Sequence, residues 1–237
     1  MIRVCREIRE TLQLSGVTWQ IRFVRNKREN EGRSGIRFMS GENKALTEKD
    51  LVWEEIKTEH LVTDEWIDIR RSAYRFPDGT VFEPFYSYSR RDYVVIAATD
   101  EEGRFLCVRQ FRQGIKEVTT EFPAGGIERK DGKEYGDKRS REVAEDALAA
   151  AKRELLEETG YESGEWEHLL TIPSNATIAD NYAYIFSAKN CRRVAGQSLD
   201  DTEFLNVCVL TEEELKERVQ NGEFQQAIHC LAWALMR

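Results

Sequence analysis

Three glutamates crowd into one short stretch, Arg153–Tyr161, which reads Arg-Glu-Leu-Leu-Glu-Glu-Thr-Gly-Tyr. Helical spacing puts Glu154, Glu157 and Glu158 within one turn, where like charges repel by roughly 0.2–0.5 kcal/mol per pair. A cation relieves this repulsion, and ligands that are all oxygen atoms favour a hard ion. The chain has only three histidines. We therefore expect Mg²⁺ or Mn²⁺, rather than zinc, at this stretch.

The alternative is an acidic face that only makes the helix soluble, because runs of charge usually do no more than that. Arg153 favours the metal site, since it can pair with Glu157 one turn further on and orient the carboxylates.

A helix that begins near Ser140, its expected N-cap, must position these glutamates. Gly160 is suited to a left-handed helix end, so the chain turns sharply after the last glutamate. Glu154 and Glu158 are expected on the polar stripe of this helix. The apolar residues at helical spacing predict the stripe that packs on the core: Ala147, Leu148, Ala151 and Leu155.

Glu145 together with Arg153–Tyr161 resembles the second part of the Nudix box. The pattern of that box is Gly, five residues, Glu, seven residues, then Arg-Glu-aliphatic-any-Glu-Glu-any-Gly-aliphatic. Seven residues do separate Glu145 from Arg153. The position where the pattern places its opening Gly holds Arg139.

The segment Glu121–Gly125, Glu-Phe-Pro-Ala-Gly, resembles the opening of the box in the ADP-ribose pyrophosphatase branch. This resemblance implies an insertion within residues 126–143. The inserted stretch mixes both charge signs with glycines, so it reads as an exposed loop, as a lid or as a partner surface. Long insertions in surface loops are thermodynamically tolerated, which favours the loop.

The resemblance also implies roles for individual residues. The metal ligands would be Glu154, Glu157, Glu158 and the carbonyl of Ala124. Arg153 would orient the carboxylates.

Further roles come from outside the box. Arg112, in Gln-Phe-Arg, matches an arginine that meets the substrate's phosphates in this branch, and Glu121 is a second candidate for the substrate site. Tyr86 is a candidate stacking residue, with core packing as the alternative. The general base would come from a late acidic loop, where we favour Glu203, with Asp201 next.

Composition excludes several classes of protein. The 237 residues carry a net charge of −8, which argues against a nucleic-acid groove. No apolar run approaches the roughly 18 residues of a membrane helix, and the N-terminus lacks the apolar region of a secretory signal. Five cysteines form no Cys-x-x-Cys pair, which predicts free thiols in a reducing cytoplasm.

Periodicity predicts a mixed α/β protein. The expected strands are 52–62, 66–76, 81–88, 93–99, 104–110, 166–172, 183–188 and 205–210, and the expected late helices are 212–219 and 225–236, with Trp233 and Leu235 in the core. The fold implied by the resemblance is the Nudix α/β/α sandwich around a mixed sheet. Residues 51–91 would form an antiparallel β subdomain, which often exchanges between subunits of a dimer in this branch, and residues 92–237 the hydrolase domain.

Residues 1–50 read as an extension of unclear structure, with strand-like alternation around Ile21 and a loop at Asn26–Gly35. Residues 1–38 carry nine Arg or Lys against four Glu. A flexible extension, a functional chain that starts near Met39, and a basic arm for anionic partners all remain open.

The expected function is metal-dependent hydrolysis of ADP-ribose to AMP and ribose 5-phosphate in a homodimer. Another nucleotide sugar, such as GDP-mannose, is the close alternative. A sensor that binds such a ligand without cleaving it, and an interaction module, are alternatives of other classes.

Overall fold

The computed structural model describes residues 8–14, 17–23, 46–128 and 146–237. The chain forms two compact units, Met1–Lys49 and Asp50–Arg237. In the first unit, β1 (Ile8–Leu14) pairs with β2 (Val17–Phe23) in an antiparallel hairpin. The alternation around Ile21 therefore predicted β2 but not its partner. The loop expected at Asn26–Gly35, most of the expected insertion, and Glu145 lie outside the described residues.

A three-stranded antiparallel sheet begins the second unit, after a short 3₁₀ helix at Glu48–Leu51. Its strands are β3 (Glu54–Thr63), β4 (Asp68–Arg75) and β5 (Val81–Ser89). Aromatic rings pack together on this sheet, with Trp53 at 4.5 Å from Phe76 and 5.4 Å from Phe85 between ring centroids. The predicted turn between β4 and β5 is present, with Gly79 in the left-handed region at φ 86°.

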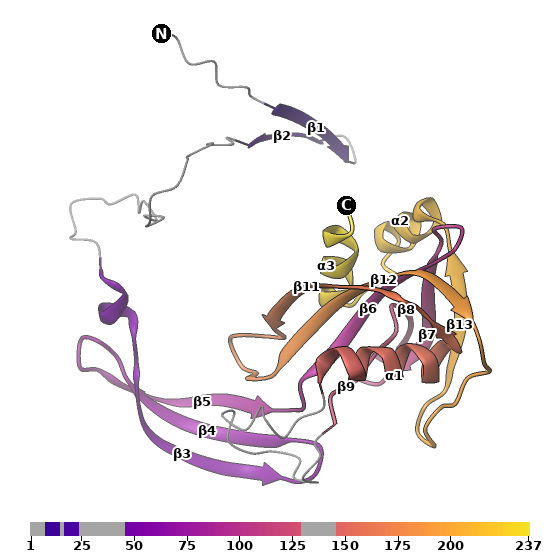
Figure 1. The fold of residues 1–237 in the computed structure, drawn as a ribbon. Coiled ribbons are helices and arrows are strands. Elements are labelled where there is room, and N and C mark those ends of the chain that lie inside the picture. Colours follow the sequence, from indigo (N-terminus) through magenta and orange to yellow (C-terminus); the bar gives the residue numbers. More distant parts are fainter. Residues whose placement is uncertain (1–7, 15–16, 24–45, 129–145) are drawn as a thin grey trace. The chain divides into compact units, whose positions relative to one another are not determined.

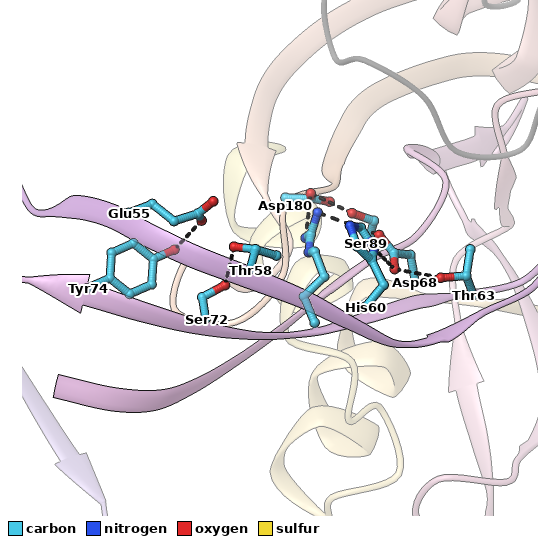
Figure 2. A network of polar contacts seen from close by, with 10 residues as sticks. Glu55, Thr58, His60, Thr63, Asp68, Ser72, Tyr74, Ser89 and Asp180 are labelled. Carbon is cyan, nitrogen blue, oxygen red and sulfur yellow. Dashed lines mark hydrogen bonds and ion pairs between the residues drawn. The ribbon is translucent and has the colours of Figure 1, made fainter.

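The loop at residues 174–181, which joins β11 to β12 of the main sheet described below, is bonded to this antiparallel sheet (Figure 2). Asp180 accepts hydrogen bonds from Arg70 at 2.9 Å and from Ser89 at 2.6 Å. Tyr88, next to Ser89, forms an isolated parallel bridge to the loop. The loop is thus held by both side chains and backbone.

The main sheet has eight strands and is mixed, because β12 runs parallel to β6 while the other pairs are antiparallel. Its strands are β6 (Tyr93–Asp100), β7 (Phe105–Arg112), β8 (Glu117–Glu121), β9 (Ala124–Gly126), β10 (Tyr161–Glu162), β11 (Glu165–Pro173), β12 (Tyr182–Arg193) and β13 (Leu205–Leu210). Strand β6 is central, with Val94–Ala98 fully buried.

Helices cover both faces of this sheet (Figure 1). Along β6, Val94 and Ile96 pack into one core cluster with α1 (Ala147–Thr159), while Val95 and Ala97 pack into a second. The second cluster includes residues of α2 (Glu212–Gln220) and α3 (Ala227–Leu235). Alternate residues of a strand face opposite sides, so one strand serves both cores. The expected α/β/α sandwich is confirmed.

Two details of the helices differ from expectation. Asp146, not Ser140, caps α1, because its carboxylate accepts from the amides of Leu148 and Ala149. Leu235 is 40% exposed at the end of α3, whereas Trp233 is buried as expected.

No helix in the described part of the chain is long and apolar enough to cross a membrane. The four cysteines within it, Cys107, Cys191, Cys208 and Cys230, are all free.

Candidate active site

The last two turns of α1 face the short segment around β9. Glu154 and Glu158 are 6% and 2% exposed, so they are buried rather than on the polar stripe where we expected them. Gly125 makes this approach possible, since a Cβ at that position would lie 2.0–2.2 Å from the carboxylate atoms of Glu154. The predicted left-handed end of the helix is present at Gly160, with φ 75°.

Strand β9 turns part of its backbone toward this helix. On either side of β9 the backbone is bonded to β6 or its flank: the carbonyl of Pro123 accepts from the amide of Ile96, and the amide of Ile127 donates to the carbonyl of Asp92. Ala124 and Gly126 therefore occupy the alternate positions, whose backbone groups face away from β6. The amide of Ala124 donates to Glu158 at 3.0 Å. The carbonyl of Gly126 accepts from Arg153 at 3.0 Å. The carbonyl of Ala124 is therefore directed to the same side as the glutamates.

Arg153 holds two of the three glutamates in place. Its Nη1 atom donates to Glu154 at 2.9 Å and to Glu157 at 3.0 Å. The pairing with Glu157 is the one that the sequence predicted. Together with the bond to Gly126, these contacts fix the guanidinium between α1 and β9.

The surroundings of the two buried glutamates compensate their ionised forms only in part. Burial raises the pKa of Glu154 to about 7, although Arg153 acts in the opposite direction. Burial, followed by the charge of Glu154, raises the pKa of Glu158 well above its ordinary value. Such shifts mark a place where added positive charge is stabilising. Within the described residues, however, no group of three or more His, Cys, Asp or Glu side chains is arranged to hold a metal ion.

A buried ion pair lies at the ends of β7 and β8. The side chain of Glu121 is fully buried, and its carboxylate accepts from Nε of Arg112 at 2.8 and 3.1 Å. Nη2 of Arg112 and the hydroxyl of Thr119 donate to it as well. Burial alone would raise the pKa of Glu121, but the hydrogen bonds from Arg112 bring it below its ordinary value. Glu121 therefore stays ionised and holds Arg112.

The late acidic loop, residues 194–204 between β12 and β13, reaches the C-terminal end of α1. Gln197 donates to the carbonyl of Glu158 at 2.7 Å, and the amide of Ser198 donates to the carbonyl of Glu157 at 2.9 Å. The loop then leads to Glu203.

Glu203 acts electrostatically on the site. Its negative charge adds to the causes that raise the pKa values of both Glu154 and Glu158, after burial and their nearer neighbours. Asp201 is exposed two residues earlier. Tyr86 lies on β5, in the other sheet, and is 54% exposed.

Two residues of this region were not foreseen. His229 on α3 accepts the amide hydrogen of Phe122 through Nδ1 at 3.1 Å, and Gln197 docks the acidic loop. His229 sits in an apolar helix, where its spacing resembles that of a core residue. Gln197 belongs to a polar loop with no periodic pattern, so neither residue carried a signal in the sequence.

Comparison with known proteins identifies this arrangement. A model of the NUDIX domain matches residues 89–230, more than half of the chain and all of the proposed site except Tyr86. The chain belongs to the Nudix family. It is accordingly a Nudix hydrolase, and the resemblance seen in the helix half of the box is confirmed.

Individual relatives match most of the chain. It is 27% identical over 180 residues to the ADP-ribose pyrophosphatase of Bacillus subtilis (strain 168), covering 76% of this chain and 89% of that protein. It is 26% identical over 166 residues to the methanol dehydrogenase activator of Bacillus methanolicus, with coverages of 70% and 82%. A crystal structure of an ADP compounds hydrolase has the same fold, at a TM-score of 0.61 and 17% identity, over 78% of this chain and 92% of that one.

Proposed function

We propose that this Nudix hydrolase cleaves the diphosphate of ADP-ribose, giving AMP and ribose 5-phosphate, with Mg²⁺ or Mn²⁺ as its cofactor. The observation that carries the proposal is the pair of buried carboxylates, Glu154 and Glu158, whose charge is only partly offset. The 27% identity to a relative named ADP-ribose pyrophosphatase supports the choice of substrate.

The metal ligands in this proposal are Glu154, Glu157, Glu158 and the carbonyl of Ala124. The chemistry of these donors suits a hard divalent ion, because every donor is an oxygen atom and two of the carboxylates are buried with raised pKa values, although the three carboxylates do not form a ready-made metal cluster in the described structure. When bound, such an ion neutralises charge on the diphosphate and activates water. Arg153 keeps the carboxylates oriented through its bonds to Glu154 and Glu157.

The other residues bind the substrate or move a proton. Arg112 binds a phosphate group, and Glu121 fixes the guanidinium that does so. Glu203 accepts the proton of the attacking water as general base, with Asp201 as the second choice. The half-exposed ring of Tyr86 offers a stacking surface for the base of the nucleotide.

The test is a panel of nucleoside diphosphate derivatives with Mg²⁺ and Mn²⁺, followed by identification of the products. AMP and ribose 5-phosphate, formed only when a divalent ion is present, support the proposal. If GDP-mannose is cleaved faster than ADP-ribose, the substrate in the proposal is wrong but the reaction class is kept. If calorimetry shows that ADP-ribose binds tightly and no product forms, the protein is a sensor rather than an enzyme.

We also propose that the antiparallel sheet is a dimer element. The sheet and the turn between β3 and β4 expose several large apolar side chains that a partner subunit would cover: Ile56, Leu61, Trp66 and Phe82. Light scattering should then give twice the 27.6 kDa mass of one chain. A monomer at micromolar concentration contradicts the proposal.

A second candidate function is the activation of a partner enzyme. The support is the 26% identity to a relative named methanol dehydrogenase activator, of which the chain covers 82%. The rate of a methanol dehydrogenase, measured with and without this chain, tests it. An unchanged rate excludes this function for that enzyme.

A further inference from the structure

His229 is a buried histidine to which the proposed reaction gives no role. It lies on α3, is 4% exposed, and packs against the rings of Phe122 and Phe224, at 6.4 and 6.3 Å between centroids. Its Nδ1 atom accepts the amide hydrogen of Phe122 at 3.1 Å. A nitrogen that accepts carries no proton, so the proton of the neutral ring is on Nε2. Burial lowers the pKa of His229 to about 4, although the charge of Glu121 opposes this shift.

Phe122 lies between residues that contact Arg112 and Glu158. It follows Glu121, whose carboxylate holds Arg112, and lies two residues before Ala124, whose amide binds Glu158. It also lies between β8, which ends at Glu121, and β9, which begins at Ala124.

The connection between β8 and β9 is fixed at two atoms. The carbonyl of Pro123 accepts from the amide of Ile96 at 2.9 Å, and Pro123 itself has no amide hydrogen. The amide of Phe122 is bound by His229. One fixed point therefore comes from the sheet and the other from a side chain of the last helix.

We propose that His229 is a positioning residue: by holding the amide of Phe122 it sets the Glu121–Gly125 segment, and through it the placement of Arg112 and Glu158. The proposal rests on the proposed hydrolysis for its effect on rate. A residue that only filled the core would need its volume, whereas this role needs an acceptor at the position of Nδ1.

The test compares His229→Asn with His229→Gln, because the side-chain oxygen of Asn can replace Nδ1 and that of Gln reaches the position of Nε2. His229→Leu keeps the volume without an acceptor. We expect kcat of the Asn variant to stay near wild type and kcat of the Gln and Leu variants to fall about 10- to 100-fold, the usual effect of losing a supporting contact. Equal losses in Asn and Gln, or wild-type kcat in Leu, overturn the proposal.

Two NMR measurements test the hydrogen bond between Phe122 and His229 independently of enzyme activity. The amide proton of Phe122 should exchange slowly in wild type and the Asn variant and faster in the Gln and Leu variants. The Nε–H resonance of Arg112 should move in the same two variants and stay in the Asn variant. If wild type cleaves no nucleoside diphosphate, the proposed function fails, while these signals still decide the role of His229: equal signals in all four proteins overturn it.

Discussion

Arg112 is bound through Nε and Nη2 to the carboxylate of Glu121, so the arginine proposed to meet the substrate is anchored on a fully buried charge. The ion pair is asymmetric, since the side chain of Arg112 is 32% exposed while that of Glu121 is not exposed at all. Solvent therefore reaches the arginine, and the glutamate depends on it for compensation.

Removing Arg112 alone should therefore destabilise the protein more than removing both Arg112 and Glu121. Arg112→Ala leaves a buried carboxylate uncompensated, and we expect it to lower the free energy of unfolding by about 3–5 kcal/mol. The double variant Arg112→Ala, Glu121→Leu should lose clearly less than the two single changes added together. Urea denaturation measures both. Additive losses would show that the two side chains do not interact.

Glu158→Gln should abolish most turnover while leaving the fold intact. The change keeps the shape and the contact with the Ala124 amide but removes the charge proposed to bind the metal. Steady-state rates with saturating Mg²⁺ and circular dichroism check the two halves of this prediction. Glu167→Gln, at an exposed position on β11, is the matched control. Near wild-type rates for Glu158→Gln would refute its assignment as a ligand.

Gly125→Ala should displace the carboxylate of Glu154. Its Cβ would lie 2.0–2.2 Å from that carboxylate, which can move because it ends a flexible side chain. We expect a folded protein whose activity falls by about tenfold or more. Gly126→Ala is the control, since its nearest neighbour would be Arg91 Cδ at 3.7 Å. Equal activity of the two variants would contradict the close approach.

The pKa of Glu154 predicts how stability depends on pH in the metal-free protein. Its folded value of about 7 lies above the ordinary 4.5, so between these values the folded state binds more protons than the unfolded state. The free energy of unfolding should therefore fall as pH rises through this window. Glu154→Gln should remove this contribution and gain about 2–3 kcal/mol on wild type between pH 4.5 and 8, while Glu158, whose pKa is also raised, keeps a fall of its own in both proteins.

His229 has the opposite effect, because its lowered pKa favours folding as pH rises from 4 to 6.5. That contribution is present in both proteins and cancels in the comparison. Thermal unfolding across the pH range gives the difference, and parallel curves for Glu154→Gln and wild type would contradict it. Added Mg²⁺ should stabilise wild type more at pH 8 than at pH 5.

Gly160→Ala should weaken the junction between α1 and the acidic loop. Gly160 has φ 75°, and a Cβ there would lie 2.3 Å from the carbonyl oxygen of Ala195, which is backbone and cannot simply rotate away. The left-handed conformation alone costs about 1–2 kcal/mol for other residues. We expect a larger loss of stability, and reduced activity if Glu203 moves with the loop. Gly164→Ala, with open space around it, should change neither.

Local patterns in the sequence predicted the helix and most strands, because burial of one face leaves a periodic trace. Strand β9 left none: Ala-Gly-Gly has little preference for a strand and is held there by pairing with β6. The burial of Glu154 and Glu158 was missed for the same reason. A glutamate on a helix reads as exposed unless the segment that covers it, here Ala124 and Gly125, is known to pack against it.

The contacts between site residues also divide into those that a local pattern predicts and those that depend on the tertiary fold. Arg153 and Glu157 are one helical turn apart, so their contact followed from spacing alone. The bonds from Phe122 to His229 and from Gln197 to Glu158 join residues 107 and 39 positions apart in the sequence. Contacts of that kind depend on how the sheet and its helices pack, and no local pattern encodes them.

The glutamates occupy the last turns of α1, the end at which aligned peptide dipoles leave a partial negative charge. Helices usually place basic residues there, yet the last turn of α1 has none. Helix and side chains thus add to the same field, which repels anions and attracts cations before any ligand bond forms. A bare diphosphate approaching this end would be turned away, whereas one that arrives with its divalent ion brings the charge that the helix end lacks.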